Sequence, residues 1–300
     1  MLSQNKTLLM TVVYPGCEKY LDDFFLSLSS QSYKHYDILI LNDGYKKNYP
    51  SETLHYEELL ISGNMEPSQI RTQGILHALA AGYEKLIFAD ADDYFSNDRV
   101  EFSIDYLEQY AFIYNKIIVV NNERVGTSFQ GVQFPEEVHD PHLIIDRNIF
   151  GLGHTAINLS INVDFNIPED ILAVDWWLFS KILIEGHKGR FVEKAITYYR
   201  QGENNFVGQN NYLDKQSLAL GVAVKKSHYS NMSEYCNSIS NNKMQELYNG
   251  KYHETIQLSN AIKDDSFLHH YLNVVNKNYA TIYNGWWSEI ISIKELKKYQ

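Results

Sequence analysis

Short, continuous apolar runs alternate with amphipathic segments along the first 120 residues of the chain. Four runs have the length of strands, and they lie at 8–13, 38–41, 86–89 and 116–120. Such runs are typical of strands buried on both faces of a parallel sheet. Between them, apolar residues recur at helical spacing, which predicts helices over 20–30, 68–79 and 99–110. The alternation predicts βαβ units and a mostly parallel α/β sheet flanked by helices.

The pattern changes after residue 121. Residues 122–164 are irregular and rich in Gly, His and Asn, and they precede a predicted helix over 172–184 and a predicted strand over 191–199. Beyond 210, helical patterns run to the last residue, with polar breaks near 230, 249 and 264. We therefore expect an α/β domain at 1–209, with halves at 1–121 and 122–209, and a helical C-terminal extension at 210–300.

Composition narrows the class of protein. Apolar residues make up 44% of the chain and charged residues 21%, which is ordinary for a globular protein. The net charge of −11 argues against a nucleic-acid partner, because an acidic chain gains little from counterion release. Cys17 and Cys236 match no metal or redox spacing, and no apolar run reaches the roughly 18 residues of a membrane helix. We expect a cytoplasmic protein with free thiols and no transmembrane segment.

The strongest chemical signal is an acidic cluster that directly follows the strand predicted at 86–89. Asp90, Ala91 and Asp92 form a D-x-D sequence, and Asp93 extends it. Hard divalent cations prefer carboxylate and phosphate oxygens, so Asp92, helped by Asp90, is a candidate ligand for Mn²⁺ or Mg²⁺. A polar loop that caps the next helix is the alternative. The position after the third strand of an α/β unit favours the metal site, because ligands bind beyond the carboxyl ends of such strands.

Two further side chains are expected at the same edge of the sheet. Asp43 follows the strand at 38–41 and could accept the N3–H of a uracil-type base. A simple turn is an equal alternative, because Asn-Asp-Gly favours turns by itself. Arg71 lies on the helix that precedes the acidic cluster and would suit a pyrophosphate. A surface arginine is the alternative there.

Asp175 begins the helix predicted over 172–184 and is followed by Trp176 and Trp177. A carboxylate beside indoles is costly to bury without a function or a partner, and burial could raise its pKa to suit a general base. The alternative is a first-turn acid stabilised by the helix dipole. The two indoles could stack on an acceptor sugar or lie in the core. His154 is a weaker candidate for the acceptor site.

Two segments nearer the C-terminus complete the candidates. Residues 198–205 are dense in hydrogen-bonding side chains, including Arg200, and could close over a diphosphate; an exposed loop is the alternative. Residues 285–287 (Gly-Trp-Trp) could rest at a lipid interface, although we expect Trp286 and Trp287 to pack against the α/β domain. The C-terminal helices could also form a homodimer surface.

Taken in order, these segments resemble the family 2 glycosyltransferases, whose fold is the Rossmann-like GT-A type. The resemblance covers roughly residues 7–206 and is carried by 12–15, 27–33, 41–44, 71–74, 88–93, 174–175 and 199–205. Asp43 matches the family's base-contacting acid, and Asp175 matches its catalytic base. The chain departs from the family pattern at Pro15, Asn42, Val174 and Gly202.

The resemblance implies an inverting transfer of a sugar from a UDP-linked donor to a hydroxyl acceptor, with Mn²⁺ or Mg²⁺ as cofactor. The half at 1–121 would bind the nucleotide-sugar, and the half at 122–209 the acceptor. Its donor-binding candidates are Tyr14, Asp43, Arg71, Asp90, Ala91, Asp92 and Arg200. Its acceptor-binding candidates are His154, Trp176 and Trp177, and Asp175 would be the catalytic base.

The family's range suggests a saccharide or glycolipid acceptor in bacterial surface glycan synthesis, with a peripheral contact at the inner membrane face left open. Two other functions stay open. A nucleotidyltransferase on a related fold is disfavoured because no Gly-rich phosphate loop follows the first strand. A non-catalytic nucleotide-sugar-binding protein is favoured by the departures at Asn42, Val174 and Gly202.

Overall fold

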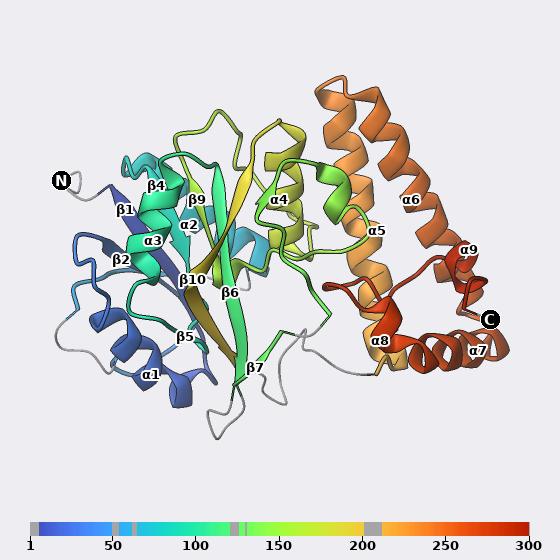
Figure 1. Ribbon diagram of the computed structural model, residues 1–300, viewed down its shortest axis with the longest axis horizontal. Coiled ribbons are helices and arrows are strands. Elements are labelled where there is room, and N and C mark those ends of the chain that lie inside the picture. The colour runs from blue at the N-terminus through green and yellow to red at the C-terminus, as the bar shows by residue number, and fades with distance from the viewer. Residues whose placement is uncertain are drawn as a thin grey trace.

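The computed structural model describes residues 6–49, 54–61, 65–120, 126–129, 131–200 and 212–299. Its centre is one mixed sheet with the strand order β3-β2-β1-β4-β9-β6-β10-β5, to which β7 adds beside β6 and β8 beside β10 (Figure 1). The strands are β1 (Thr7–Val13), β2 (Asp37–Asn42), β3 (Glu57–Leu60), β4 (Lys85–Phe88), β5 (Tyr94–Phe95), β6 (Phe112–Val120), β7 (Gly126–Ser128), β8 (Glu137–Val138), β9 (Thr155–Asn158) and β10 (Gly189–Arg200).

Helices cover the sheet and extend beyond one end of it. Those of the sheet region are α1 (Glu18–Ser29), α2 (Pro67–Ala80), α3 (Arg99–Leu107), α4 (Val174–Ile184) and the short 3₁₀ helices η1 (Pro141–Ile144) and η2 (Leu152–His154). The C-terminal helices are α5 (Lys215–Ser238), α6 (Asn242–Ala261), α7 (Asp265–Lys277), α8 (Tyr279–Ile282) and α9 (Ile293–Leu296). Figure 1 shows α5 and α6 side by side, next to α4.

The prediction of a mostly parallel α/β sheet is confirmed. β1 pairs in parallel with both β2 and β4, and β6 pairs in parallel with β10. The main exception is β9, which lies antiparallel between β4 and β6. This strand falls in the stretch that the sequence pattern left irregular. β9 joins the two parallel groups, so the acidic segment after β4 and the 3₁₀ helix before β9 lie close together.

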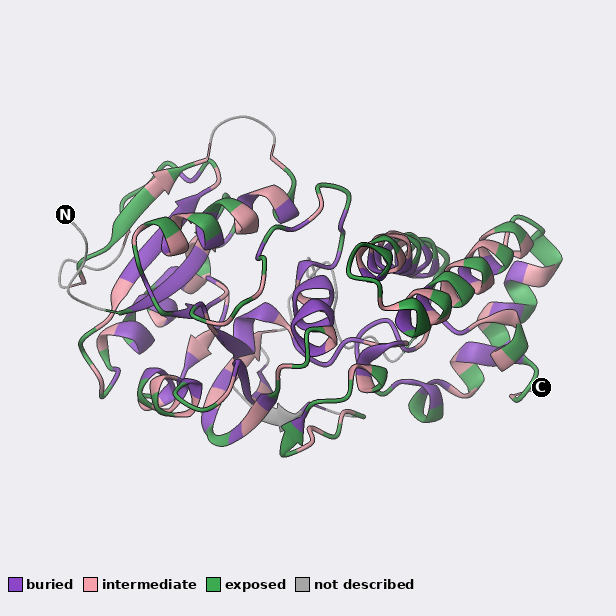
Figure 2. Ribbon diagram, turned by 90° about the horizontal axis from the view of Figure 1, so that it is seen from above, coloured by how far each residue is buried: buried purple, intermediate pink, exposed green. Residues whose placement is uncertain are grey.

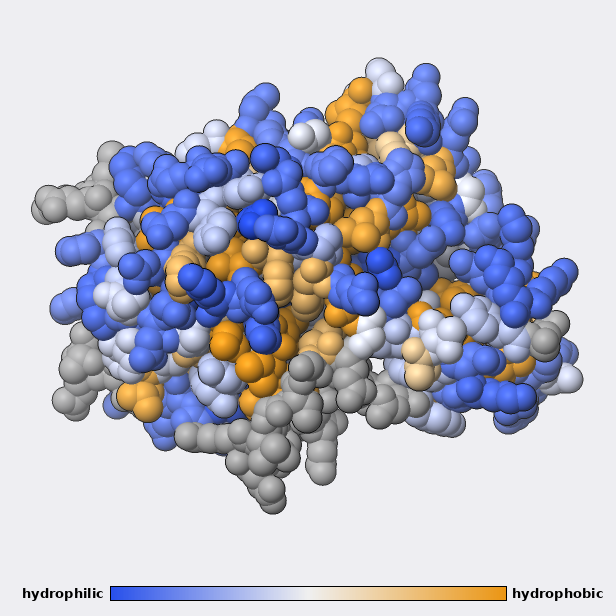
Figure 3. Space-filling view, in the orientation of Figure 1, coloured by the Kyte–Doolittle hydropathy of each residue, from blue (hydrophilic) through white to orange (hydrophobic). Residues whose placement is uncertain are grey.

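The continuous apolar runs reflect burial on both faces of the sheet. On β1, Met10 packs in the cluster that includes α2, whereas Leu9 and Val13 pack in the cluster that includes α1. α2 approaches closely because Gly74 faces the sheet: a Cβ there would lie 2.3 Å from the sulfur of Met10. Figure 2 shows the central strands as buried, whereas the edge strand β3 is largely exposed and the helices carry exposed residues on their outer faces. In the orientation of Figure 1, the molecular surface is hydrophilic at both ends and has hydrophobic side chains toward its middle (Figure 3).

The C-terminal extension is helical, as expected, but two of its predicted breaks are wrong. α5 continues through residue 230 and α6 through residue 249. Near 249 the polar residues lie on the exposed face of α6, where an amphipathic helix tolerates them. The break near 264 is confirmed, because the Asp264 carboxylate caps α7 by accepting the N–H of Phe267 at 2.8 Å. The expected domain boundary at 209/210 lies outside the described residues.

No helix within the described ranges has both the length and the apolar character needed to cross a bilayer.

Candidate active site

The structure brings acidic side chains together at the carboxyl edge of the sheet. Asp90, Asp92 and Asp93 follow β4, and Asp175 lies in the first turn of α4. The charge of Asp90 acts on all three of the others, which places each of them within electrostatic range of Asp90. The α/β rule that ligands bind beyond the strand ends therefore identifies this edge as the candidate site.

The segment 90–93 concentrates negative charge in a poorly solvated place. Burial and the charge of Asp90 raise the pKa of Asp92 to about 6. Asp93 is buried, and burial together with the charges of Asp92 and Asp90 raises its pKa well above the usual range. Its Oδ1 accepts the backbone N–H of Arg200 at 2.9 Å, whereas its Oδ2 has no hydrogen-bond partner within the described residues. A cation at this place would relieve the repulsion.

Arg99, which the sequence analysis missed, lies buried beneath this segment. Its Nη2 donates to the carbonyls of Phe88, at 2.6 Å, and Gly153, at 3.0 Å, and its Nε donates to Asn115 Oδ1 at 3.2 Å. Burial lowers the pKa of Arg99 to about 9, and the charges of Asp93 and Asp90 oppose this shift. The guanidinium thus joins the end of β4 to η2. An arginine in the first turn of a helix carries no sequence signal for such an inward position.

Arg200, a donor-binding candidate, holds the acidic segment in place. Its Nη1 donates to the carbonyl of Asp92 at 2.8 Å, and its Nη2 pairs with the carboxylate of Asp23 on α1. Its guanidinium also lies over the ring of Tyr94, 4.8 Å from the centroid. These contacts occupy the side chain, and the rest of the predicted diphosphate-closing stretch, 201–205, lies outside the described residues.

Arg71 differs from both of these arginines. It lies half-buried on α2, and no hydrogen bond or ion pair engages it within the described parts of the chain. Its charge lowers the pKa of both Asp92 and Asp175, so it lies within electrostatic range of the two acidic groups. The Ser68 hydroxyl anchors the start of α2 to the segment before α4 by donating to the carbonyl of Glu169 at 3.1 Å. Arg71 is therefore positioned to receive an anionic ligand.

Asp175 has features of both a first-turn acid and a general base, the two interpretations that the sequence left open. Its Oδ1 accepts the backbone N–H of Trp176 at 2.7 Å, as a first-turn acid does. Burial nevertheless raises its pKa to about 6, against the opposing effects of this hydrogen bond and of Arg71. A half-buried carboxylate with such a pKa is ionised at neutral pH and basic enough to accept a proton.

The first two strand ends carry the other donor candidates. Asn42 takes the turn-forming role, because its Oδ1 accepts the N–H of Tyr45 at 2.7 Å. This leaves the half-buried Asp43 carboxylate without a hydrogen bond within the described residues. Burial and the charges of Asp92 and Asp90 raise the pKa of Tyr14, so its hydroxyl lies within electrostatic range of the acidic pair. Ala91 is 1% exposed, so this conformation leaves it almost no surface for contact with a ligand.

The three acceptor-binding candidates require correction, because the structure places them in the core. Trp176 is fully buried, and its Nε1–H donates to the carbonyl of Ile144 at 2.6 Å. Trp177 is 4% exposed and meets the ring of Tyr235 edge-on. His154 is 3% exposed, and burial and the charge of Arg99 lower its pKa to about 3. None of these rings presents a free face to a saccharide in this conformation.

Trp286 packs against the α/β domain, as the sequence analysis expected. Its ring lies 5.0 Å from that of Phe129 and 5.9 Å from that of His154, measured between centroids. Its backbone exchanges two hydrogen bonds of 2.9 Å with Asn148. The C-terminal segment is therefore part of the wall behind η2.

The acidic segment suits a cation that is also held by a ligand. No group of three or more His, Cys, Asp or Glu side chains in the described ranges forms a metal site by itself. Asp90 and Asp92 nevertheless repel each other, and Asp93 has a buried oxygen without a partner. Hard cations such as Mg²⁺ commonly use one or two carboxylates and complete their shell with phosphate oxygens and water. The donor set therefore fits Mg²⁺ or Mn²⁺ shared with a diphosphate.

Comparison with known proteins agrees with this geometry. The family profile described as Glycosyl transferase family 2 matches residues 10–158. No curated protein matches the sequence.

Solved structures share the fold at low sequence identity. TarS of S. aureus is similar with a TM-score of 0.56 at 14% identity, over 92% of this chain and 48% of that one. The TarS fragment 1–349, in complex with UDP-GlcNAc, has a TM-score of 0.54 at 14% identity. The match covers 98% of this chain and 90% of that one. GalNAc-T7 with UDP, GalNAc and Mn²⁺ has a TM-score of 0.51 at 14% identity. The match covers 82% of this chain and 54% of that one. This chain thus spans about half the length of the longer TarS chain.

The mostly parallel sheet is of the GT-A type, and its acidic residues lie where ligands bind in such folds. Together with the profile match over residues 10–158, this shows that the chain is similar to glycosyl transferase family 2 in both sequence and fold.

Proposed function

We propose that the protein transfers a sugar from a UDP-linked donor to a hydroxyl acceptor, with inversion at the anomeric carbon and with the help of a divalent cation. The observation that carries this proposal is that the charge of Arg71 acts on two carboxylates in different surroundings. One of them is Asp92 in the acidic segment 90–93, and the other is Asp175 at the start of α4. An anion site thus adjoins both a cation site and a base.

The donor side follows from the chemistry of a nucleoside diphosphate. The free carboxylate of Asp43 can accept the N3–H of uracil, and the guanidinium of Arg71 can pair with the phosphates. Asp90 and Asp92 would hold the cation, whose chemistry is to neutralise the diphosphate as it leaves. The TarS fragment was solved with UDP-GlcNAc and GalNAc-T7 with UDP and Mn²⁺, which supports this class of donor.

The acceptor side depends on Asp175. Its carboxylate, with a pKa of about 6, can take the proton of a hydroxyl as the oxygen attacks the anomeric carbon. Arg71 stabilises the ionised form of this carboxylate before the reaction. A base opposite the leaving diphosphate gives inversion, through a transition state with oxocarbenium character. The family's range extends this to saccharide or glycolipid acceptors of bacterial surface glycans.

Thermal denaturation with nucleoside diphosphates and UDP-sugars, each with and without Mn²⁺, tests the donor side. A ligand at a hundred times its Kd stabilises the folded state by about 2.7 kcal/mol. We expect a Mn²⁺-dependent rise in Tm with UDP that is absent in Asp92→Asn. The control is Asp105→Asn, the same change at an exposed position of α3, which should keep the full rise.

Turnover tests the acceptor side. We expect release of UDP from at least one UDP-sugar across a panel of hydroxyl acceptors, and its loss in Asp175→Asn. Binding of UDP without any turnover over the whole panel would instead indicate a nucleotide-sugar-binding protein. Release of pyrophosphate from UTP and a sugar phosphate would indicate a nucleotidyltransferase.

A further inference from the structure

The helical extension reaches the first turn of α4 through a pair of stacked rings. The imidazole of His228, on α5, lies flat on the indole of Trp176, with ring centroids 3.9 Å apart and an angle of 11° between the planes. Both residues are at most 1% exposed. Because Trp176 directly follows Asp175, this pair joins the extension to the proposed base.

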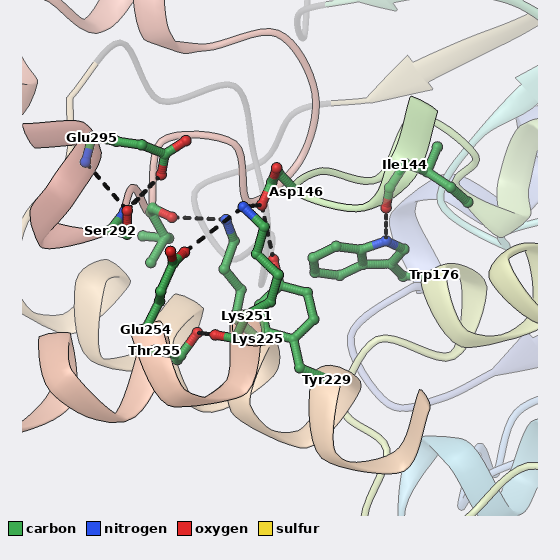
Figure 4. Close-up of polar contacts among 11 residues, drawn as sticks. Ile144, Asp146, Trp176, Lys225, Tyr229, Lys251, Glu254, Thr255, Ser292 and Glu295 are labelled. Atoms are coloured by element: carbon green, nitrogen blue, oxygen red, sulfur yellow. Dashed lines mark hydrogen bonds and ion pairs between the residues drawn. The ribbon is translucent and has the colours of Figure 1, made fainter. Parts of the chain in front are cut away.

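Trp176 transmits its position to the carboxylate. Its backbone N–H donates to Asp175 Oδ1 at 2.7 Å. Its indole Nε1–H donates to the carbonyl of Ile144 at 2.6 Å (Figure 4). Tyr229 meets the indole edge-on, with centroids 5.8 Å apart. A shift of the indole therefore moves the hydrogen bond that orients the carboxylate.

The segment that carries Ile144 is itself bound to the extension. Asp146 pairs with Lys251 of α6 at 2.6 Å and accepts a hydrogen bond from Tyr229 at 3.5 Å (Figure 4). On α5, the buried Lys225 donates to the carbonyl of Ile290 at 2.7 Å. A cavity of about 20 Å³ is left among these groups, room for about one water. The extension therefore holds Trp176 firmly from two sides.

His228 contributes a flat ring and no hydrogen bonds. Neither of its ring nitrogens has a partner among the described residues. A buried polar atom without a partner costs free energy, so an apolar ring would be less costly for the fold alone. Burial and the charge of Lys225 lower the pKa of His228 far below the usual range, which keeps the stacked ring neutral.

We propose that His228 is a positioning residue for sugar transfer, which holds Trp176 and thereby orients the carboxylate of Asp175. The inference rests on the proposed function, in which Asp175 takes the acceptor proton. No hydrogen bond or ring contact joins His228 to Asp43, Arg71 or Asp92 within the described residues. Its removal should therefore lower kcat and leave donor affinity unchanged.

Four variants of the full chain separate positioning from packing. His228→Ala removes the ring, His228→Leu keeps apolar volume without a flat ring, and His228→Phe keeps a ring that can stack. Leu218→Ala is the control, because Leu218 is fully buried on the same helix but belongs to the separate cluster around α7. Thermal denaturation shows which variants are folded at the assay temperature.

The readouts are kcat and KM for UDP release from UDP-GlcNAc, and hydrogen–deuterium exchange of the amides at 174–178. A misplacement near 1 Å can cost about a hundredfold in rate. We expect kcat to fall at least tenfold in His228→Ala and His228→Leu, with KM within twofold of wild type and faster exchange at 174–178. His228→Phe should restore both kcat and protection, and Leu218→Ala should lower only Tm.

A double-mutant cycle with Asp175→Asn separates this inference from the proposed function. If His228 acts through Asp175, His228→Leu should change kcat less than twofold in the Asp175→Asn background. Full additivity of the two losses would overturn the positioning role and leave the base assignment standing. An active Asp175→Asn variant would overturn both. Unchanged exchange at 174–178 in His228→Leu would overturn the positioning role even without any turnover.

Discussion

The acidic segment 90–93 and the first turn of α4 both present carboxylates to the same edge of the sheet, but their surroundings differ. Arg99 lies beneath the segment and Arg200 beside it, each held by several hydrogen bonds. Near Asp175, the charge that favours ionisation is that of Arg71, which makes no hydrogen bond within the described residues. Hydrogen bonds hold the first centre, where we propose the cation site, whereas the second centre has a carboxylate whose pKa is about 6.

The difference suggests that the two centres have separate roles. Carboxylates that are fixed in place and have few positively charged neighbours attract a metal ion, which can in turn bind a diphosphate. A carboxylate whose pKa lies near 6 exchanges protons readily with an acceptor. Each of the following changes is aimed at one centre, except the change at Arg71, whose charge acts on both Asp92 and Asp175.

The largest effect is expected for Asp175→Asn. The amide is similar in shape but cannot take a proton, so we expect kcat to fall by about 10²–10⁴. Binding of UDP with Mn²⁺ should be unchanged, because that site belongs to the other centre. Steady-state kinetics and the UDP-dependent shift in Tm measure the two effects separately. A parallel loss of UDP binding would mean that the two centres are one.

The next largest effect is a difference in stability between substitutions of Arg99 and of Arg71. Arg99→Met removes a buried cation together with its hydrogen bonds to the carbonyls of Phe88 and Gly153, so we expect a loss of about 3–5 kcal/mol in the free energy of unfolding. Arg71→Met makes the same change at a residue without such bonds and should cost less than about 1 kcal/mol, while weakening UDP binding. Urea denaturation compares them. Equal losses would show that Arg71 also supports the fold.

The sequence was enough to locate the first centre, for a physical reason. β1, β2 and β4 are continuous apolar runs, and in a parallel sheet the polar residues that follow them must meet at one edge. β9 could not be predicted, since its four residues lie in a stretch with no clear period.

The surroundings of the second centre depend on contacts that local pattern does not encode. Trp176 and Trp177 resemble a stacking platform in the sequence, but α5 and its neighbours bury them. Arg99 faces inward because Asn115 and Gly153, distant in the chain, provide its acceptors. Neither arrangement follows from residue spacing alone.

A smaller effect should come from Gly153→Ala. A Cβ at this position would lie 2.3 Å from Asp90 Oδ2, so the carboxylate must shift. Overpacking of this kind costs about 1–3 kcal/mol, and we expect weaker Mn²⁺-dependent binding of UDP. Gly250→Ala is the control: nothing lies within 4 Å of its Cβ on α6, and it should stabilise the helix by about 0.5–1 kcal/mol. If Gly153→Ala binds UDP and Mn²⁺ normally, Asp90 takes no part in the cation site.

The smallest effect tests whether the ionised Asp92 carboxylate destabilises the folded protein. Its pKa rises from 3.8 to about 6 on folding, because of burial and the charge of Asp90. The unfolded chain therefore loses this proton first, and wild type loses stability relative to Asp92→Asn as the pH rises from about 4 to 6. Without ligands, we expect equal Tm values at pH 4 and a Tm a few degrees higher for the variant at pH 7.5.

Mn²⁺ with UDP should reverse that order at pH 7.5, because only wild type keeps the carboxylate that binds the cation. Asp105→Asn, exposed on α3, should follow wild type under every condition. If Asp92→Asn were instead less stable than wild type at pH 7.5 without ligands, the Asp92 carboxylate would already be compensated in the free protein. The acidic segment would then resemble the surroundings of Asp175, and the contrast between a centre that awaits a cation and a centre that exchanges a proton would not hold.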